Sequence, residues 1–492
     1  MKTATQFQSS VFAIGQLNLS TGCEQIVVGG RDRFKLLPAA FDNSNVQKIA
    51  FIGWGKQAPA QACNLRDSLL ECGSKVIVSV GLRSNSPSRA DAREKGFTEA
   101  SGTLGDIETV VSDADLVILL IEDRAQVSRW KQIIGYMKPC ATLGLSHGFL
   151  IGRLQSIGEV LRDDINVIMV APKGVGSSVR DLYLKGRDTN GAGINASVAI
   201  FQDVTGNALD VALAWSIGIG SPMTFFTTMI HEVISDLTGE RAGLLAGPWG
   251  LTEARYKALR AVDIAPIPSF LQSAKGLTGI VTKLISEYGL LGFYENLETQ
   301  FQPAFERGYI QAYAGSKRLV EKIYEHVESG QEISDVILAT DALETTPMSQ
   351  VDKGEMWTVA REEGLYGQDV PMTERLAYTA GMYIAMLMAG IEVLIAKGHS
   401  GSEAINEQLI EGIDSLNQLM DRSGIANMVD SCSKTARIGT RTWGPEYEEM
   451  FTKAHGIPTE GNEGIFQNFL RSPFHEDIEE CYKLRPSVRL VQ

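Results

Sequence analysis

The sequence predicts an α/β N-terminal domain followed by an all-α C-terminal domain. Between residues 46 and 204, short apolar runs of strand length alternate with segments of helical spacing. After residue 208 the strand-like runs fade, and long helical patterns continue toward the C-terminus. Strands that are covered by helices on both faces appear as continuous apolar runs. We therefore expect a doubly wound sheet in residues 1–225 and a helical domain in residues 226–492.

The individual elements follow from the same periodicities. Segments with helical spacing are found at 58–72, after the first predicted strand, and at 125–138, after the third. Later in the chain, helical spacing recurs at 225–237, 276–288 and 403–420. Two of the later helices carry an acidic pair each, which suggests an internal duplication of the helical domain. The five predicted strands are VQKIAFIG (46–53), KVIVSVGL (75–82), DLVILLI (115–121), ATLGLS (141–146) and NVIMVA (166–171).

Composition limits the classes of function. The 492 residues are enough for roughly two or three domains with ample cores. A formal net charge of −14, without a run of Lys or Arg, argues against nucleic-acid binding. The six cysteines show no CxxC spacing, which favours free thiols in a reducing compartment over disulfides or structural zinc.

No segment predicts a membrane anchor. The N-terminus lacks the apolar core of a signal peptide. The longest apolar stretch, residues 379–396, contains Glu392 and is of marginal length for a span. We expect a buried core helix there, and a soluble intracellular protein without a membrane partner.

A glycine-rich turn follows the first predicted strand. Gly53 and Gly55, with Ala58 three residues later, form the pattern G-x-G-x-x-A at the start of a helix. Two glycines permit a tight turn and let a pyrophosphate approach the N–H groups of the helix N-terminus. Such a pattern alone is also compatible with a plain structural turn. Its position after the first strand of an α/β pattern favours a Rossmann-like dinucleotide site.

The loop after the second strand indicates which dinucleotide is bound. NAD sites usually place an acid there to bind the ribose 2′-hydroxyl, but no Asp or Glu occurs between residues 76 and 90. Arg83, Ser86 and Ser88 stand there instead, and they suit a 2′-phosphate. A solvated loop is the alternative, and the upstream glycines favour NADPH.

Three polar residues lie at the carboxyl ends of later strands. Ser146 is the last residue of the strand at 141–146 and His147 is the next residue, while Lys173 follows the strand at 166–171. Ligands of open α/β sheets bind outside the carboxyl ends of the strands. A single His or Lys at a strand end is equally compatible with a structural role.

Two pairs of acids have i, i+4 spacing, so each pair shares one face of a helix. They are Asp236 with Glu240, and Glu407 with Glu411. Two such pairs supply the oxygen ligands that Mg²⁺ prefers. The first pair shares its face with the apolar Met229, where buried carboxylates are costly unless they bind a partner.

The second pair has a different setting. Glu407 and Glu411 lie opposite an apolar stripe that includes Leu409, Ile413 and Leu416. By this pattern alone, the second pair is predicted to lie on a solvated face rather than in a site.

Seven motifs occur in order along the chain: GWGKQAPAQACNLRDSL, GLRSNSPSRADAREKGF, LGLSHGF, VAPKGVGSSVR, SDLTGER, INEQLIEGIDSLNQLM and MVDSCSKTARIG. Together they resemble the ketol-acid reductoisomerase family in its long, plant-like form. The resemblance covers nearly the whole chain, and it implies an enzyme of branched-chain amino-acid biosynthesis. The implied reaction converts 2-acetolactate or 2-aceto-2-hydroxybutyrate to a 2,3-dihydroxy acid, by an Mg²⁺-dependent alkyl migration and reduction by NADPH.

The resemblance also implies roles for particular residues. Asp236 would bridge two Mg²⁺ ions, with Glu240 at one of them and the pair 407/411 at the other. Ser433 would contact the substrate carboxylate. The candidate catalytic residues are His147, Lys173 and Glu240. The candidate cofactor-binding residues are Gly53, Gly55, Gln57, Arg83, Ser86, Ser88, Asp123 and Ser146.

One segment departs from the plant-like pattern. Residues 248–268 (PWGLTEARYKALRAVDIAPIP) fit it poorly, and we expect them to alter a substrate-pocket wall or a subunit contact. The resemblance further implies a homo-oligomer, in the cytoplasm of a bacterium or in the plastid stroma after removal of a transit peptide.

Two other classes stay open from the residues alone. One is a metal-independent NADPH-dependent hydroxyacid dehydrogenase, and the other is a non-catalytic cofactor-binding protein.

Overall fold

The computed structural model describes residues 7–188 and 193–485, and its chain divides into two compact units. The first unit is built mainly from Gly22–Val233, and the second mainly from Ile234–Cys481 together with Leu19–Thr21. The division falls inside helix α9 (Met229–Gly239), whereas the boundary expected from the sequence precedes this helix. All six cysteines lie in the described part of the chain, and none of them forms a disulfide.

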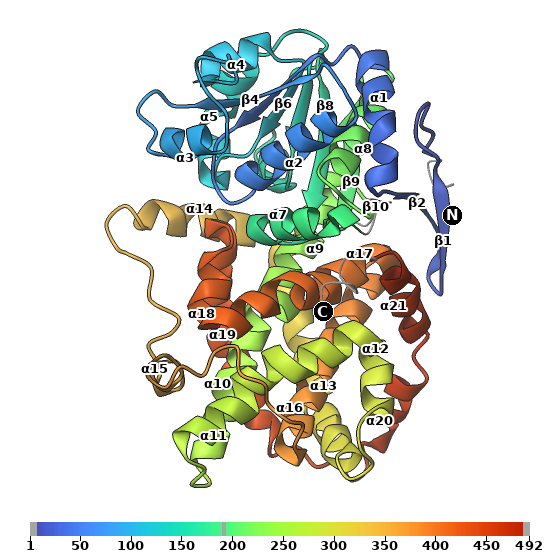
Figure 1. The fold of residues 1–492 in the computed structure, drawn as a ribbon. Helices are drawn as coiled ribbons and strands as arrows, with labels where there is room; N and C mark the ends of the chain where they lie inside the picture. Colours follow the sequence, from blue (N-terminus) through green and yellow to red (C-terminus); the bar gives the residue numbers. More distant parts are fainter. Residues whose placement is uncertain (1–6, 189–192, 486–492) are drawn as a thin grey trace. The chain divides into compact units, whose positions relative to one another are not determined.

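The first unit contains a ten-stranded mixed sheet with the order β1-β2-β10-β9-β8-β7-β6-β3-β4-β5 (Figure 1). Its inner strands β4, β3, β6, β7 and β8 pair in parallel, as for Ile52 opposite Gly81. The strands are β1 (Gly15–Leu19), β2 (Gly22–Val28), β3 (Lys48–Ile52), β4 (Ile77–Leu82), β5 (Leu104–Asp106), β6 (Leu116–Leu119), β7 (Thr142–Leu145), β8 (Asn166–Pro172), β9 (Ala196–Gln202) and β10 (Met223–Phe226).

Two helical layers cover this sheet. Successive residues of a strand point to opposite faces, so Ile49 and Phe51 of β3 join one core while Ala50 and Ile52 join the other. Helices α1, α2 and α8 pack on the first face, and α4, α5 and α6 on the second. The helices are α1 (Leu37–Asn43), α2 (Ala58–Glu71), α3 (Ser88–Glu94), α4 (Ile107–Asp113), α5 (Asp123–Gly135), α6 (Phe149–Ser156), α7 (Gly176–Lys185) and α8 (Ala208–Gly218), with 3-10 turns η1 (Arg31–Leu36) and η2 (Gly186–Asp188).

The five predicted strands are confirmed as β3, β4, β6, β7 and β8, and the Rossmann-like class is confirmed with them. The sequence did not reveal the other five strands. Strand β1 alternates exposed and buried residues, and β5 has only three residues, so neither forms a continuous apolar run. Because β2 and β9 each pair antiparallel with a neighbour, the sheet is mixed rather than purely parallel.

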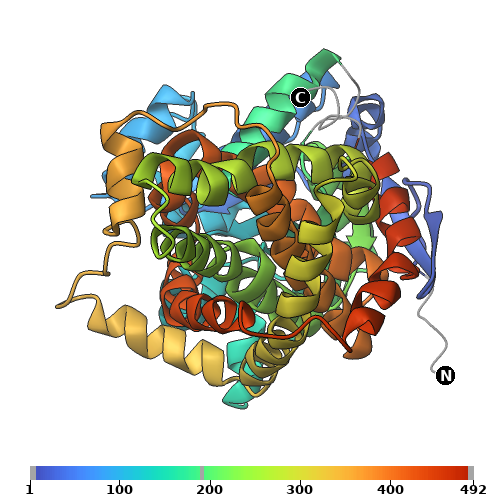
Figure 2. The ribbon, with the colours of Figure 1, turned by 90° about the horizontal axis from the view of Figure 1, so that it is seen from below.

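From Ile234 to Cys481, the regular structure of the second unit is helical (Figure 2). Several of its segments are π-helical, with wider turns than an α-helix. Its elements are η3 (Glu240–Leu244), α10 (Ala246–Arg260), α11 (Pro266–Phe270), η4 (Leu271–Lys275), η5 (Leu277–Val281), α12 (Thr282–Glu295), α13 (Gln302–Glu328), α14 (Gln331–Ala342), α15 (Glu355–Glu362), α16 (Glu374–Ala396), α17 (Gly401–Ile405), η6 (Asn406–Ile410), η7 (Gly412–Leu416), α18 (Asn417–Asp430), α19 (Lys434–Ala454), α20 (Glu463–Leu470) and α21 (Phe474–Lys483).

Helix α16 lies in the core of this unit. In the described chain it is the one helix long and apolar enough to cross a membrane, but 83% of its most apolar window is buried inside the protein. It packs closely on α13, because a Cβ on Gly381 would lie 2.1 Å from the carbonyl oxygen of Phe305. The predicted burial of this apolar stretch is confirmed.

Candidate active site

The glycine turn after β3 has the backbone that the sequence predicts. Gly53 has a φ of +106°, which side chains other than glycine rarely adopt. A Cβ on Gly53 would also lie 2.7 Å from the carbonyl oxygen of Leu120 at the end of β6. For Gly55, the corresponding distance to this oxygen is 3.9 Å, so packing inside the protein does not require glycine there. A glycine at this position would let a cofactor phosphate approach the protein backbone closely, which is a sufficient reason for Gly55.

Gln57 stands directly before α2 and holds this turn to a neighbouring strand end. Its Nε2 donates to the carbonyl oxygen of Gly174 at 2.8 Å, next to Lys173. Ser146 has a comparable structural role, since its hydroxyl donates to the carbonyl oxygen of Val170 at 2.8 Å. Asp123 is the first residue of α5 and is half-buried.

A cavity of about 530 Å³ opens beside the loop after β4. Arg83 lines it together with Arg129 from α5, and neither guanidinium lies within ion-pair distance of an acid in the described chain. Ser86 and Ser88 lie outside this lining; Ser88 instead begins α3. Sequence reasoning missed Arg129, because it joins Arg83 only through the packing of α5 beside the sheet.

Asp106 and Glu108 also line this cavity, and the charge of Asp106 is already neutralised. Asp106 forms an ion pair with Arg89, whose guanidinium also pairs with Glu99 at 3.0 Å. The charge of Arg89 is thus used within the protein, whereas Arg83 and Arg129 face the cavity as two cations. Two arginine side chains that face one cavity are suited to bind a phosphate group.

The strand-end residues His147 and Lys173 meet at one buried carboxylate, Glu232 of α9. Lys173 Nζ lies 3.3 Å from Glu232 Oε1, and the Nδ1 of His147 lies 3.1 Å from Oε2. The backbone N–H of Gly148 donates to the same Oε2 at 2.7 Å. Lys173 and Glu232 are each only 1% exposed. The structure therefore joins two predicted residues through a third that we had not assigned to the site.

The electrostatics of Glu232 follow from these contacts. Burial alone would raise the pKa of its carboxyl, but the charges of His147 and Lys173 and the hydrogen bonds to the carboxylate outweigh it and hold the pKa below its usual range. Glu232 is thus an anion at neutral pH. Its acceptance of a hydrogen bond from Nδ1 fixes the proton of His147 on that nitrogen and leaves Nε2 as the second ring position.

Three of the four predicted metal ligands converge in the helical unit. Carboxylate oxygens of Asp236, Glu407 and Glu411 all lie within 4.8 Å of one another. Asp236 is on α9, while Glu407 lies in η6 and Glu411 directly follows it. Three carboxylates at this spacing repel one another, and a hard divalent cation is the partner that such an oxygen set fits.

The predicted solvated face around Glu407 is wrong. Glu407 is fully buried, Glu403 is 1% exposed and Asp414 is 5% exposed. The apolar stripe on the opposite side indicated one buried face, but other helices of the unit cover both faces. Backbone contact with α9 is one of the covering interactions, because a Cβ on Gly239 would lie 2.4 Å from the carbonyl oxygen of Glu407.

Glu240, the fourth predicted ligand, is oriented by the fully buried Arg241. The guanidinium of Arg241 donates to Glu240, to Glu332 of α14 at 2.8 Å, and to the carbonyl oxygen of Thr435 at 3.1 Å. Burial would lower the pKa of Arg241, but the charges of Glu332 and Glu240 outweigh it and raise the pKa. Arg241 directly follows Glu240 in the motif SDLTGER, and sequence reasoning gave it no role.

Ser433, the predicted substrate contact, caps helix α19. Its hydroxyl accepts the backbone N–H of Ala436 at 3.0 Å, and the side chain is exposed. The first turn of α19 also supplies Thr435, whose carbonyl oxygen accepts from Arg241. One cation thereby ties Glu240 to the helix start that carries Ser433.

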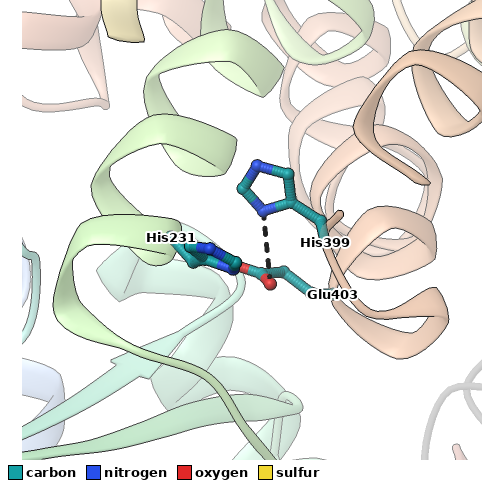
Figure 3. Close-up of side chains that lie close together, drawn as sticks. All are labelled: His231, His399 and Glu403. Atoms are coloured by element: carbon teal, nitrogen blue, oxygen red, sulfur yellow. Dashed lines mark ion pairs between the residues drawn. The ribbon is translucent and has the colours of Figure 1, made fainter. Parts of the chain in front are cut away.

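A second buried pair supports α9 next to Asp236. His399 Nδ1 lies 3.4 Å from Glu403 Oε2, the ion pair drawn in Figure 3. Ser235 Oγ donates to the other oxygen of Glu403 at 2.8 Å, and Tyr324 approaches His399 Nε2 at 3.1 Å. These contacts fix the helix turn that presents Asp236.

Comparison with known proteins matches both parts of the chain to one family. Residues 44–224 match the NADPH-binding domain of acetohydroxy acid isomeroreductase, and residues 229–363 and 372–472 match the ketol-acid reductoisomerase C-terminal domain. The chain is 44% identical to the chloroplastic ketol-acid reductoisomerase of Spinacia oleracea, over 99% of this chain and 83% of the relative. The Pisum sativum chloroplastic enzyme is 43% identical over 98% of this chain and 84% of its own.

A solved structure adds the fold. The NADH-preferring ketol-acid reductoisomerase from an uncultured archean superposes with a TM-score of 0.54 at 25% identity, covering 65% of this chain and 95% of its own. The two relatives are 44% and 43% identical over nearly the whole chain, and both domain models match it. The chain therefore belongs to the ketol-acid reductoisomerase family, oxidoreductases of branched-chain amino-acid biosynthesis.

Proposed function

We propose that the chain converts 2-acetolactate, and its homologue 2-aceto-2-hydroxybutyrate, to 2,3-dihydroxy acids with NADPH and Mg²⁺. The observation that carries this proposal is the convergence of Asp236, Glu407 and Glu411 within one helical unit. A hydroxyacid dehydrogenase without a metal has no use for a partly buried cluster of three carboxylates. Family membership supplies the reaction class, and the acids supply the reason to expect the metal.

Asp236, Glu240, Glu407 and Glu411 are the residues that would hold two Mg²⁺ ions. Bound there, the ions would polarise the substrate ketone and stabilise the alkoxide during alkyl migration, while NADPH supplies the hydride. Arg241 holds the carboxylate of Glu240 in one orientation. Ser433, at the start of α19, is our candidate for binding the substrate carboxylate, together with the N–H groups of that helix turn.

His147 and Lys173 are our candidates for proton transfer and charge stabilisation. Glu232 keeps the Nδ1 proton of His147 in place, so proton exchange with a substrate oxygen falls to Nε2. The same carboxylate holds Lys173 in a buried position at the end of β8. We assign Glu232 a positioning role, because its contacts are with these two side chains.

The cofactor preference rests on Arg83 and Arg129. Two cations without acidic partners suit a ribose 2′-phosphate, which favours NADPH over NADH. We expect Arg83→Gln with Arg129→Gln to raise the KM for NADPH about tenfold or more, and to leave the KM for NADH nearly unchanged. Lys131→Gln, also on α5 but paired with Glu159, is the control. An equal effect on both cofactors would refute the 2′-phosphate assignment.

The reaction is tested by NADPH oxidation with 2-acetolactate, with and without Mg²⁺. We expect oxidation that requires Mg²⁺, and a loss of turnover of at least about a hundredfold in Asp236→Asn. Oxidation that persists in EDTA would favour the hydroxyacid dehydrogenase. Tight NADPH binding without turnover of this substrate would favour a non-catalytic protein.

The assembly and the compartment stay predictions. We expect a homo-oligomer, which light scattering of the purified chain tests. The plastid stroma is expected for a eukaryotic source and the cytoplasm for a bacterial one; the two relatives above are chloroplastic.

A further inference from the structure

The helical unit contains a second cavity of about 520 Å³, which shares no residue with the acidic cluster. Its size is typical of a small-molecule site. Helices α10, α13 and α16 and the residue after α19 contribute its walls. We call it the arginine pocket, and its lining is Arg255, Gln272, Arg307, Gln311, Thr373, Glu374, Arg375, Tyr378 and His455.

Arg255 is the innermost charge of the arginine pocket and is only 6% exposed. Its Nε donates to Thr379 Oγ1 at 3.0 Å, and its Nη1 lies 3.1 Å from His455 Nε2. In the described chain no carboxylate lies within ion-pair distance of this guanidinium, although buried arginines usually pair with an acid. Burial, together with the charges of Arg307 and Arg375, lowers the pKa of Arg255 to about 10.

A chain of hydrogen bonds shows that His455 contacts Arg255 as a neutral acceptor, so the positive charge of Arg255 stays unbalanced. Gln311 Nε2 donates to the carbonyl oxygen of Ile457 at 2.7 Å, so its Oε1 accepts the hydroxyl of Tyr378. The Tyr378 oxygen then accepts from His455 Nδ1–H at 2.9 Å, which leaves Nε2 to accept from Arg255. Burial and the nearby Arg255 lower the pKa of His455 to about 4, so it is neutral at pH 7.

The remaining arginines leave the pocket with an excess of positive charge. Arg307 pairs loosely with Glu374 at 3.6 Å, and both side chains are largely exposed. Arg375 forms no ion pair with an acid in the described chain. The guanidinium carbons of Arg255 and Arg307 lie 4.7 and 5.4 Å from the ring centroid of Tyr378, which holds them on one side chain. Clustered cations repel one another, and an anion bound among them would relieve that repulsion.

We propose that the arginine pocket binds a small anionic metabolite through phosphate or carboxylate oxygens, at Arg255, Arg307 and Arg375. Arginine is suited to this because its planar guanidinium donates two parallel hydrogen bonds to an oxyanion. Arg255, the central cation of the site, lies in the segment 248–268, for which we expected an altered substrate-pocket wall or subunit contact. The pocket shares no residue with the Arg83 cavity or with the acidic cluster, and the proposal does not depend on the proposed reaction.

The test is titration calorimetry of the full chain with inorganic phosphate and, separately, with malonate, at constant ionic strength and in EDTA. We expect saturable binding of at least one of the two, and a loss of affinity of tenfold or more in Arg307→Gln/Arg375→Gln. Arg318→Gln is the matched control, because it is an exposed arginine of α13 outside the pocket lining. Binding of phosphate alone identifies a phosphate ester as the ligand class, and binding of malonate alone identifies a carboxylate.

Three outcomes would overturn the proposal. The first is that the unmodified chain binds neither phosphate nor malonate. The second is that the double variant and the Arg318→Gln control bind the anion with equal affinity. The third is that an oligomer dissociates in the double variant although the unmodified chain binds no anion. The last result would show that the arginines contact a partner subunit. A thermal-shift measurement gives an independent readout, since phosphate or malonate should stabilise the unmodified chain and not Arg255→Gln.

Discussion

Glu232 is a buried carboxylate whose two oxygens are shared by a lysine, a histidine and a backbone N–H. Replacing it by Gln keeps the shape but removes the charge that offsets buried Lys173. Because an unbalanced buried charge is costly, we expect Glu232→Gln to lower the free energy of unfolding by about 3 kcal/mol or more. Urea unfolding followed by tryptophan fluorescence measures it.

A surface pair provides the control for that substitution. Glu159 pairs with Lys131 at 2.7 Å, but both side chains are well exposed. Glu159→Gln should therefore cost no more than about 1 kcal/mol. Similar losses in the two variants would show that burial does not set the strength of the Glu232 contacts.

His455 makes stability depend on pH in a defined window. Burial and Arg255 lower its pKa from 6.5 to about 4 in the folded protein. Between these values the unfolded chain binds a proton that the folded chain does not, so stability is full above pH 6.5 and falls as the pH drops toward 4. We expect a flatter pH dependence of the unfolding free energy in His455→Gln. Identical slopes in the two proteins would contradict this origin.

At the scale of elements, the close approach of α9 to η6 sets the spacing of the candidate metal ligands. Gly239 has a helical φ of −59°, so its backbone accommodates alanine, but the added Cβ would lie 2.4 Å from the carbonyl oxygen of Glu407. Separating these elements moves Asp236 away from Glu407. We expect Gly239→Ala to weaken Mg²⁺ binding about tenfold or more, as measured by calorimetry.

Gly464 in α20 is the matched control, because no atom lies within 4 Å of a Cβ built there. Gly464→Ala should leave Mg²⁺ binding unchanged. Unchanged affinity in Gly239→Ala as well would show that the backbone contact does not position the ligands.

The same elements show where helical periodicity misleads. An α-helix with one apolar stripe is normally exposed on its other side, and residues 403–420 were interpreted that way. The structure replaces part of this helix by the π-helical segments η6 and η7 and buries both sides. Burial of Glu407 depends on which helices pack around it, and the spacing of its neighbours in sequence does not encode that.

At the scale of the whole molecule, the candidate cofactor residues and the candidate metal ligands belong to different units. The glycine turn and the Arg83 cavity belong to the first unit, and Asp236, Glu407 and Glu411 to the second. The division falls inside helix α9, which carries Glu232 in the first unit and Asp236 in the second.

This division predicts separable ligand effects on thermal stability. NADPH and Mg²⁺ should each stabilise the chain by about 2.7 kcal/mol at a hundred times their Kd. We expect Asp236→Asn to lose the Mg²⁺ effect alone, and Arg83→Gln/Arg129→Gln to lose most of the NADPH effect alone. Differential scanning calorimetry measures both. Loss of both effects in either variant would contradict two independent sites.

The sequence by itself determined the local features of this protein. Apolar runs in the sequence predicted the five inner strands, and the glycine pattern predicted the turn at Gly53. The i, i+4 spacing identified the acidic pairs. All of these features depend on residues that are close together in the sequence. The motifs also identified the family.

Only the tertiary structure decided which distant side chains share an environment. It joined Arg129 to Arg83, Arg241 to Glu240 and Glu332, and three arginines to one pocket. It also buried Glu407, which the pattern had placed in solvent. These contacts arise from the packing of helices far apart in the chain, where burial and charge depend on neighbours that no local period specifies.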